Sequence, residues 1–426
     1  MTGERMIREE AREGSSAVGS ASGGSGGNAG PIGSGSEWLK RSREEAWKIH
    51  DGLPMPDRAR HLWRYTDPAA LLPEAALIPR ASVEPRASAE VVLSESARRA
   101  GAIAIPLVDA IREDHTLVRE KLGALVPSVF GKPEALNMAA WSAGHFVHLP
   151  GGVRIEDPIR LISAPPRGSF RAFRHLILVE EGAEATIVDE SRGPDGRESS
   201  WASMVTELFV GEGARVRYVR LQRLGRGAVA HATFRARLGR DASLRTAIAS
   251  IGGGLYKADL GVLMDGEGAE SRMSGFVLCD GAQRADHHTV HDHRVARTHS
   301  DINLRVVLGG RARSAYTGLI RIAEEAPYCE AFQENRNLLL SDGCRAESIP
   351  ELEILTDEVR CKHGATAGPI DEDQLFYLES RGLSRAKATE MVILGFLEET
   401  LSHLGSDETE TIMGELAARA AEITRP

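Results

Sequence analysis

A short motif recurs between residues 183 and 344: a tight turn of glycine and charged residues, followed by a small residue. The successive spacings of these small residues are 31, 28, 27, 43 and 32 positions, for Ala183, Ala214, Ala242, Ala269, Ala312 and Cys344. Such spacings are typical of stacked coils in a solenoid, with each small residue pointing inward at a tightly packed corner. The longer step predicts an insertion. The repeat favours a β-solenoid, and a β-sandwich with regular turns is the alternative.

Short runs of β-forming residues lie between these turns, which supports the same interpretation. They cover Leu176–Val179, Thr186–Val188, Val205–Val210, Val216–Leu221 and Leu304–Leu308. Many short strands at close spacing are typical of solenoids, sandwiches and barrels. We therefore predict a mainly β fold.

Composition and the pattern of apolar residues divide the chain into four regions. Glycine and serine dominate the first region, which predicts a disordered tail. A helix over residues 37–50 opens the second, largely helical region, and the third is the β core. The fourth region is helical again. The predicted boundaries are 1–36, 37–145, 146–370 and 371–426.

Three helices are expected after Asp371. The first ends at Gly382, and Ser384 can cap the second. Apolar residues recur at steps of three and four, and in the third helix they are Ile412, Leu416, Ala420 and Ile423. These stripes can pack on the β core, on each other or on a partner protein.

Composition excludes several classes of protein. The formal net charge of −9 argues against nucleic acid as the main partner, because phosphate binding requires a basic field. No stretch approaches the roughly 20 apolar residues that span a bilayer, and Met1–Gly35 contains no apolar signal segment. We expect a cytoplasmic protein that does not bind membranes. Its four cysteines are too few for a disulfide framework and are expected to be thiols, at Cys279, Cys329, Cys344 and Cys361.

The segment Arg360–Gly364 reads RCKHG and is the sharpest local feature. In a strand, Cys361 and His363 point to the same face, and thiolate and imidazole are both ligands for iron or zinc. The basic neighbours Arg360 and Lys362 are expected to lower the pKa of the thiol. The alternative is a packed thiol beside a hydrogen-bonded histidine.

A second cluster places five of the fourteen histidines within thirteen residues, in DHHTVHDH over residues 286–293 and at His299. In a strand, His287, His291 and His293 share one face, which predicts either a metal site or a ladder of hydrogen-bonded histidines. A self-contained histidine-rich metal-binding protein is therefore an alternative function.

Several catalytic motifs are absent from the sequence. It contains no GxxxxGK[ST] phosphate loop, no GxSxG nucleophile elbow between an expected strand and helix, and no dinucleotide fingerprint after a strand. We expect that the chain does not hydrolyse ATP by itself and is not an enzyme. A solenoid enzyme that acts on carbohydrate is a further alternative.

The stretch from Gln333 to Leu401 resembles the C-terminal half of the SufD proteins, which belong to the SufB/SufD family that assembles iron–sulfur clusters. The matching blocks are QENRNLLLSDG, PELEI, DEVRCKHGAT, DEDQLFYLESRG and GFLEETL, in this order between Gln333 and Leu401. Upstream, HHTVHDH, ALN at Ala135–Asn137 and WRYTDP at Trp63–Pro68 also resemble the family. The resemblance covers most of the chain from about Leu53 onward.

This resemblance implies a fold and a function. The fold is a right-handed parallel β-helix between N- and C-terminal helical regions. The function is that of a scaffold in a SufB–SufC–SufD complex, in which a transient iron–sulfur cluster or iron is held at the SufB–SufD interface and the SufC ATPase drives assembly. FADH₂ accompanies the family's complex, and a homodimer is an alternative state of the isolated chain.

The resemblance also assigns residues. The histidine implicated in building the nascent cluster corresponds to His363, and Cys361 is the second candidate. The C-terminal helices of the family hold the ATPase, so apolar residues there are candidates for partner binding, namely Phe376, Tyr377, Met391 and Phe396.

Two positions favour the SufD branch over SufB. SufB proteins typically carry a cysteine in the segment matching Asn335–Ser341, where this chain begins with asparagine. They also tend to read HEA where this chain has His363-Gly364-Ala365. Cys329 and Cys344 depart from the SufD pattern, which usually has threonine and alanine at these positions.

Overall fold

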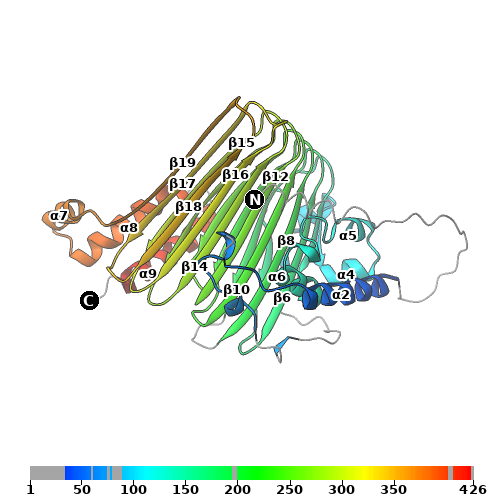
Figure 1. Ribbon diagram of the computed structural model, residues 1–426, viewed down its shortest axis with the longest axis horizontal. Helices are drawn as coiled ribbons and strands as arrows, with labels where there is room; N and C mark the ends of the chain where they lie inside the picture. The colour runs from blue at the N-terminus through cyan, green and yellow to red at the C-terminus, as the bar shows by residue number, and fades with distance from the viewer. Residues whose placement is uncertain are drawn as a thin grey trace, which may run out of the picture.

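Two long, mostly parallel β-sheets face each other in the computed structural model (Figure 1). The structure describes residues 34–58, 61–73, 77–78, 89–193, 199–401 and 406–423. The predicted glycine- and serine-rich tail lies outside these residues, except for the start of a helix at Ser34. From β4 onward, consecutive strands alternate between the two sheets, so the chain winds as a solenoid. The predicted mainly β solenoid is confirmed, and the sandwich alternative is wrong.

Sheet A contains the odd-numbered strands from β5 onward, together with β1. All neighbours in it are parallel except β1 and β5. In spatial order its strands are β1 (Ala89–Val92), β5 (Ile159–Ser163), β7 (Glu184–Arg192), β9 (Arg215–Arg223), β11 (Ser243–Ser250), β13 (Glu270–Cys279), β15 (His299–Leu308), β17 (Cys329–Leu339) and β19 (Val359–Pro369).

Sheet B contains the even-numbered strands and the short strand β3 (Trp141–Ala143), which pairs with β6. Only β2 and β4 are antiparallel neighbours. In spatial order its strands are β18 (Arg345–Ile354), β16 (Arg313–Ile322), β14 (Arg284–His293), β12 (Leu255–Met264), β10 (Ala228–Leu238), β8 (Ser200–Val210), β6 (Phe170–Val179), β4 (His145–Leu149) and β2 (Ile103–Pro106).

The predicted runs of β-formers all lie in strands, within β6, β7, β8, β9 and β15, and the small corner residues pack in the solenoid core. The predicted insertion is wrong. Ala269 and the three alanines before it precede strands of sheet A, and Thr298 occupies the equivalent corner before β15. Ala312 and Cys344 precede β16 and β18 of sheet B instead. The longer step arises because the motif passes from one corner of the coil to the other.

The solenoid interior is mainly apolar but contains a buried ion pair. Asp189 accepts hydrogen bonds from the Arg220 guanidinium and the Tyr218 hydroxyl, and all three side chains are buried. Burial alone would raise the pKa of Asp189, but the Arg220 charge holds this pKa below its usual range. The carboxylate is therefore ionised inside the solenoid.

Helices close the N-terminal end of the solenoid and cover part of the outer face of sheet B. The helix expected over residues 37–50 is confirmed as α2, and its apolar side packs with α4 and α6 against Phe146 and Leu176. These elements are α2 (Ser34–Gly52), α3 (Glu95–Arg99), α4 (Leu107–Arg112), α5 (Thr116–Lys121), α6 (Lys132–Ala140) and the short 3₁₀ helices η1 (His61–Trp63), η2 (Pro68–Leu71) and η4 (Ser128–Phe130).

A second buried ion pair anchors this helical layer to sheet B. Arg174 Nη2 donates to Glu207 Oε1 over 2.7 Å, and both side chains are fully buried. The other oxygen of Glu207 accepts the backbone amides of Leu125 and Val126. Asn137 of the ALN block donates to the backbone carbonyls of β6 and β8. This sequence block therefore has a structural role.

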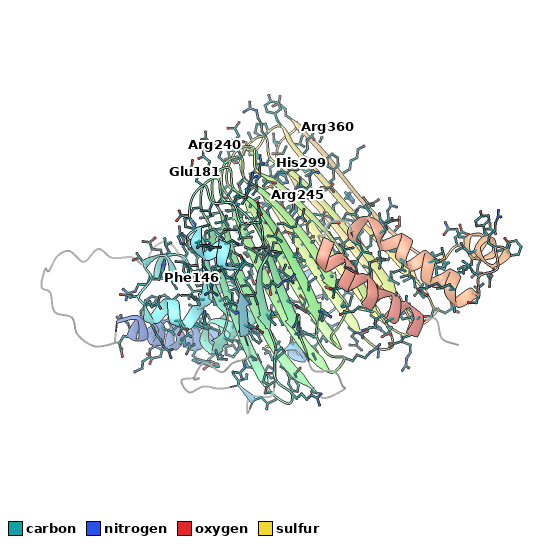
Figure 2. All side chains as sticks on the ribbon, turned by 180° about the vertical axis from the view of Figure 1, so that it is seen from behind. Phe146, Glu181, Arg240, Arg245, His299 and Arg360 are labelled. Atoms are coloured by element: carbon teal, nitrogen blue, oxygen red, sulfur yellow. The ribbon has the colours of Figure 1, made fainter. Side chains whose placement is uncertain are left out.

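Three helices follow the solenoid, as expected: α7 (Glu372–Ser380), α8 (Arg385–Leu401) and α9 (Ser406–Ile423). The Asp371 side chain caps α7, and the Ser384 hydroxyl accepts the Lys387 amide at the start of α8. The apolar stripes of α8 and α9 pack on the outer face of sheet A (Figure 2), whereas α7 projects from the body (Figure 1). None of the helices in the described ranges is long and apolar enough to cross a membrane.

Candidate functional site

The C-terminal end of the solenoid is an open edge. β18 and β19 are the last strands of their sheets, and each has a strand partner on one side only among the described residues. Every residue of β6 is buried, whereas every residue of β18 and β19 is half-buried or exposed. An unpaired strand edge offers backbone donors and acceptors to another chain.

Cys361 and His363 lie on this last strand, and their side chains take the inward direction of the solenoid. His363 is in register with Gln333 of β17, whose buried amide donates across the interior to the Gly318 carbonyl. Gln333 in turn is in register with Ile302 of the solenoid core. His363 continues this column but is exposed, because no further coil covers it among the described residues.

The coil beneath His363 presents a polar floor, which the sequence analysis did not identify. Gln333, Asn335 and Asn337 are all buried and alternate along β17. The buried oxygens Gln333 Oε1 and Asn337 Oδ1 have no hydrogen-bond partner among the described residues. Unsatisfied acceptors next to an open edge suit a ligand or a partner that brings donors. The signal that could have revealed this floor is the spacing of one coil between Gln333 and His363.

The expected activation of the Cys361 thiol is wrong. Burial and the neighbouring Cys329 raise the pKa of Cys361 above its usual value. The basic neighbours do not reach the thiol: Arg360 Nη1 pairs with Glu330 Oε1 at 2.9 Å, and Lys362 takes the opposite face of the strand. Cys361 is therefore a protonated thiol in the isolated chain.

The other three cysteines are buried in the solenoid, and all four are free thiols. Burial raises the pKa of Cys279 to about 12. The Cys329 sulfur lies 3.1 Å from the Thr298 hydroxyl, and the Cys344 sulfur lies 3.2 Å from the Ser341 hydroxyl. These contacts support packing roles.

The backbone of β19 is also directed at the open edge. In a parallel sheet, successive residues of a strand form their backbone hydrogen bonds alternately with the two neighbouring strands. In β17 the Glu330 amide donates to the Thr298 carbonyl, just before β15, so the residues on either side of Glu330 bond to β19 instead. By the observed register, Arg360 and Lys362 bond to β17. The amides of Cys361, His363 and Ala365 then face the free edge.

The histidine cluster forms β14 and is placed differently. His287, His291 and His293 point into the interior, where each ring Nε2 lies within 3.3 Å of a serine hydroxyl of sheet A, on Ser250, Ser271 and Ser300 respectively. Burial lowers the pKa of His287 to about 4 and those of His291 and His293 to about 3. Hydrogen-bonded, neutral histidines match the ladder alternative.

No group of three or more His, Cys, Asp or Glu side chains within the described ranges is arranged to hold a metal ion. This statement covers both the β14 histidines and the Cys361–His363 pair. The two side chains on β19 supply two metal ligands at most.

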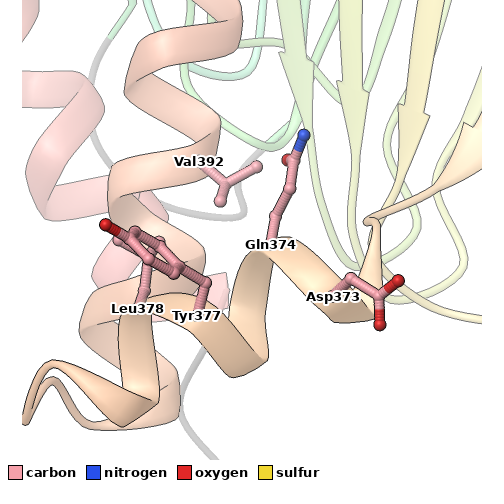
Figure 3. A pocket seen from close by; sticks show the side chains of 5 residues that line it. All are labelled: Asp373, Gln374, Tyr377, Leu378 and Val392. Carbon is pink, nitrogen blue, oxygen red and sulfur yellow. The ribbon is translucent and has the colours of Figure 1, made fainter.

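A second exposed surface lies on the projecting helix α7 and the start of α8. Phe376 and Tyr377 are 72% and 57% exposed, and Met391 is 46% exposed. Tyr377 also lines an open hollow of about 460 Å³ with Val392 and other residues of the two helices (Figure 3). Phe396 differs, because the Arg305 guanidinium lies 5.5 Å from its ring and holds it against sheet A.

The fold therefore defines the class of parallel β-solenoid proteins with helices at both ends, and this one leaves its last strands and α7 exposed. Residues 162–396, more than half of the chain, match the model of the SufBD core domain, described as SUF system FeS cluster assembly. The chain therefore belongs to the SufBD family of iron–sulfur cluster assembly proteins.

Individual relatives agree with this assignment. The chain is 29% identical over 333 residues to the iron–sulfur cluster assembly protein SufB of Bacillus subtilis, covering 77% of this chain and 71% of the relative. It is 28% identical over the same shares to an iron–sulfur cluster assembly SufBD family protein of Staphylococcus epidermidis. A SufBD family protein of Staphylococcus aureus is 27% identical, again over 333 residues.

Proposed function

We propose that this chain is a SufD-type scaffold subunit and not an enzyme. Its open solenoid end would pair with a SufB-like subunit, and its α7–α8 surface would hold a SufC-like ATPase. The nascent iron–sulfur cluster is the cargo of this assembly and forms between the two scaffold subunits. The single observation that carries the proposal is the position of His363 on β19, the last strand of sheet A, whose outer edge has no strand partner among the described residues.

Pairing at the open end is supported by the geometry of β19. The amides of Cys361, His363 and Ala365 face the free edge, so a strand from a partner can extend sheet A through backbone hydrogen bonds. The same pairing would bury His363 and the polar floor beneath it. A closed site would then replace an exposed one.

The donor set fits transient binding of iron. His363 and Cys361 supply one imidazole and one thiol, and a four-coordinate iron site needs two further ligands. The partner strand would supply them, so neither chain alone would retain the cluster. A protonated Cys361 thiol must lose its proton to bind iron, which couples loading to proton release.

The SufD assignment is supported by Asn335. This residue is buried on β17, and its amide donates to the Leu304 carbonyl. SufB-type proteins place a sulfur-accepting cysteine in this segment, whereas this strand holds an amide. The chain would then contribute a scaffold surface and a histidine rather than the sulfur acceptor.

The ATPase contact is supported by the contrast between α7 and α8. Leu375 is buried, while Phe376 and Tyr377 are among the most exposed large apolar side chains of the described residues. An arm that keeps aromatic side chains in solvent suits binding of another protein. Phe396 packs on sheet A and is better explained as a structural residue than as a partner contact.

The test of the cluster site is anaerobic co-purification of the chain with the SufB and SufC of its own source, followed by iron and acid-labile sulfide counts. We expect His363→Ala to assemble normally but to lose most of the cluster. The matched control is His299→Ala. His299 lies on the outer face of sheet A and is partly exposed (Figure 2).

Equal cluster content in wild type and His363→Ala would make His363 structural and overturn its role. Failure of the wild type to form a complex would overturn the proposed partners. Loss of cluster in both histidine variants would point to a general defect rather than to the site on β19.

The ATPase contact has a separate test. Tyr377→Ala should reduce SufC capture at least tenfold without changing SufB capture, because the hollow between α7 and α8 loses its aromatic wall. The control is Tyr328→Ala, since Tyr328 is also 57% exposed but lies at a solenoid corner. Equal losses in the two tyrosine variants would count against a specific site on α7.

A further inference from the structure

The strongest feature outside the regions described above is a ladder of three arginines on the outer face of sheet B. Arg284, Arg313 and Arg345 occupy the same register position in β14, β16 and β18. All three are exposed, and none forms an ion pair or a side-chain hydrogen bond within the part of the chain that the structure describes. In a chain with a net charge of −9, this is not a general excess of basic residues.

The three arginines border a defined pocket of about 130 Å³. The WRYTDP segment forms the opposite wall, with Tyr65, Thr66 and Asp67, so residues from the start of the chain meet the last coils of the solenoid. Such a pocket encloses a small ligand on two sides, which a bare strand surface does not.

Buried contacts fix the wall formed by the WRYTDP segment. The Thr66 hydroxyl donates to Asp286, and the buried Lys257 ammonium lies 3.1 Å from the same carboxylate. Lys257 also donates to the Leu62 carbonyl at 2.6 Å and lies 5.0 Å from the ring of Trp63. The wall is therefore held in place without using the three arginines.

The acidic residues of the pocket do not neutralise the ladder. Asp286 is engaged by Lys257 and Thr66, and the Asp67 carboxylate accepts the Ala69 amide at 3.0 Å as a helix cap. Only Glu347 has no such partner among the described residues. Three arginine charges therefore face one unengaged carboxylate.

Adjacent arginines on neighbouring strands lie about 4.8 Å apart at their Cα atoms, so they repel one another. A shared anion removes this repulsion. Each guanidinium presents a planar fork of donors that matches phosphate oxygens, and three forks in a row span about 10 Å. That length suits a ligand with more than one phosphate group rather than a single small anion.

We propose that Arg284, Arg313 and Arg345, facing Tyr65 across the pocket, form a binding site for a small molecule that carries two or more phosphate groups. The arginines bind successive phosphate oxygens, and the Tyr65 wall limits the ligand to an elongated shape. Because Arg345 belongs to the last coil, the bound ligand lies beside the open edge of sheet B. The site does not depend on the assembly role proposed above.

The test is isothermal titration calorimetry of the full chain with pyrophosphate, at low and at physiological salt. The wild type should bind, with an affinity that falls as salt rises. Arg313→Gln removes the central fork and should weaken binding at least tenfold. The affinity of Arg313→Lys for pyrophosphate should lie between those of the wild type and Arg313→Gln, because lysine keeps the charge but loses the fork of donors.

The matched control is Arg245→Gln. Arg245 is also exposed, has no ion pair among the described residues and lies in a register column with Arg217 and Arg272, but on sheet A and outside this pocket (Figure 2). It should leave pyrophosphate binding within twofold of the wild type. If Arg313→Gln fails to fold, Arg345→Gln replaces it with the same expectation.

Any of three outcomes with pyrophosphate would overturn the proposal: no binding to the wild type, equal weakening by Arg245→Gln, or unchanged binding by a folded Arg313→Gln. Orthophosphate serves as the length probe. Binding of orthophosphate as tight as that of pyrophosphate would exclude a ligand with more than one phosphate.

Discussion

The two ends of the solenoid are built in different ways. At the N-terminal end, β1 and β2 run antiparallel to their neighbours, and helices pack over the outer face nearby. At the C-terminal end, β18 and β19 also have one strand partner each among the described residues, but they run parallel to it and continue the repeat to its last strand. A reversed strand breaks the parallel repeat, whereas a last parallel strand invites another.

The two ends also differ in how deeply their inward side chains are buried. Near the closed end, inward residues such as Leu161 and Ile187 are fully buried. In the last coil, the inward positions of β18 and β19 hold Ser348, Pro350 and Ala365, which are half-buried or exposed. Inward residues near the N-terminal end are thus shielded by this chain itself, whereas those of the last coil remain accessible among the described residues.

The largest expected effect is at the buried ion pair. Asp189→Ala leaves the Arg220 charge buried without a partner, which costs about 3–5 kcal/mol. Urea unfolding measures this loss. Glu347→Ala on the exposed last coil is the control and should change stability by less than about 0.5 kcal/mol. Similar losses in both variants would mean that the last coil is as tightly held as the interior.

Two isoleucines compare the ends directly. Ile187→Ala creates a cavity at a fully buried position and should cost about 2–5 kcal/mol. Ile354→Ala at the open end, where the side chain is 37% exposed, should cost less than about 1 kcal/mol. Urea unfolding at two protein concentrations checks this. A cost of Ile354→Ala that grows with concentration would reveal a second copy covering the open end.

The closed end should also be sensitive to acid. Burial, then the charge of His175, lowers the pKa of His145 to about 3, well below the value near 6.5 of an unfolded histidine. Between these values only the unfolded chain binds the proton, so stability falls as pH decreases below about 6.5. The slope is about 1.4 kcal/mol per pH unit for this residue.

Urea unfolding between pH 7.5 and pH 5 would be compared in the wild type and in His145→Gln, which should flatten the slope by one proton. The control is Val147→Ala, the next inward residue of β4. It should lower stability at every pH without changing the slope. An unchanged slope in His145→Gln would show that this histidine is protonated in the folded chain.

The smallest expected effect concerns the edge itself. Ala365→Pro removes an amide that faces the free edge, so it should spare the fold but weaken capture of a SufB-like partner at least tenfold, about 1.4 kcal/mol. Quantitative pull-down measures the capture. Val92→Pro on β1, the edge strand of the closed end, should leave capture unchanged. Equal losses would mean that pairing does not occur through β19.

The sequence predicted the solenoid because its corners are periodic. Ala183, Ala214 and Ala242 sit where each coil turns, and a small side chain is required there regardless of the rest of the coil. The change of corner between Ala269 and Ala312 was not predictable, because a turn and a small residue look alike at both corners. The coil between them has Thr298 at the corner where the other coils have alanine, so a search for small apolar residues did not detect that corner.

The candidate site was only partly predictable. Alternation in a strand placed Cys361 and His363 on one face, and this depends on local geometry alone. The pKa of Cys361 depends on what packs around it in space, including Cys329 from the coil below, so the basic neighbours in sequence were misleading. Tyr377 and Phe396 look equivalent in an apolar stripe, and only the packing of α8 on sheet A separates them.

The packing of α8 and α9 on sheet A has a mechanical consequence. The two helices share one apolar cluster with residues from Val188 in β7 to Leu338 in β17, and α8 contacts both β13 and β15, so the packing joins consecutive coils. Hydrogen bonds between the coils run along the solenoid axis and resist stretching in the same direction. A pull along the solenoid axis would therefore load these hydrogen bonds and the helix packing together, and the coils that α8 joins would separate only if both gave way.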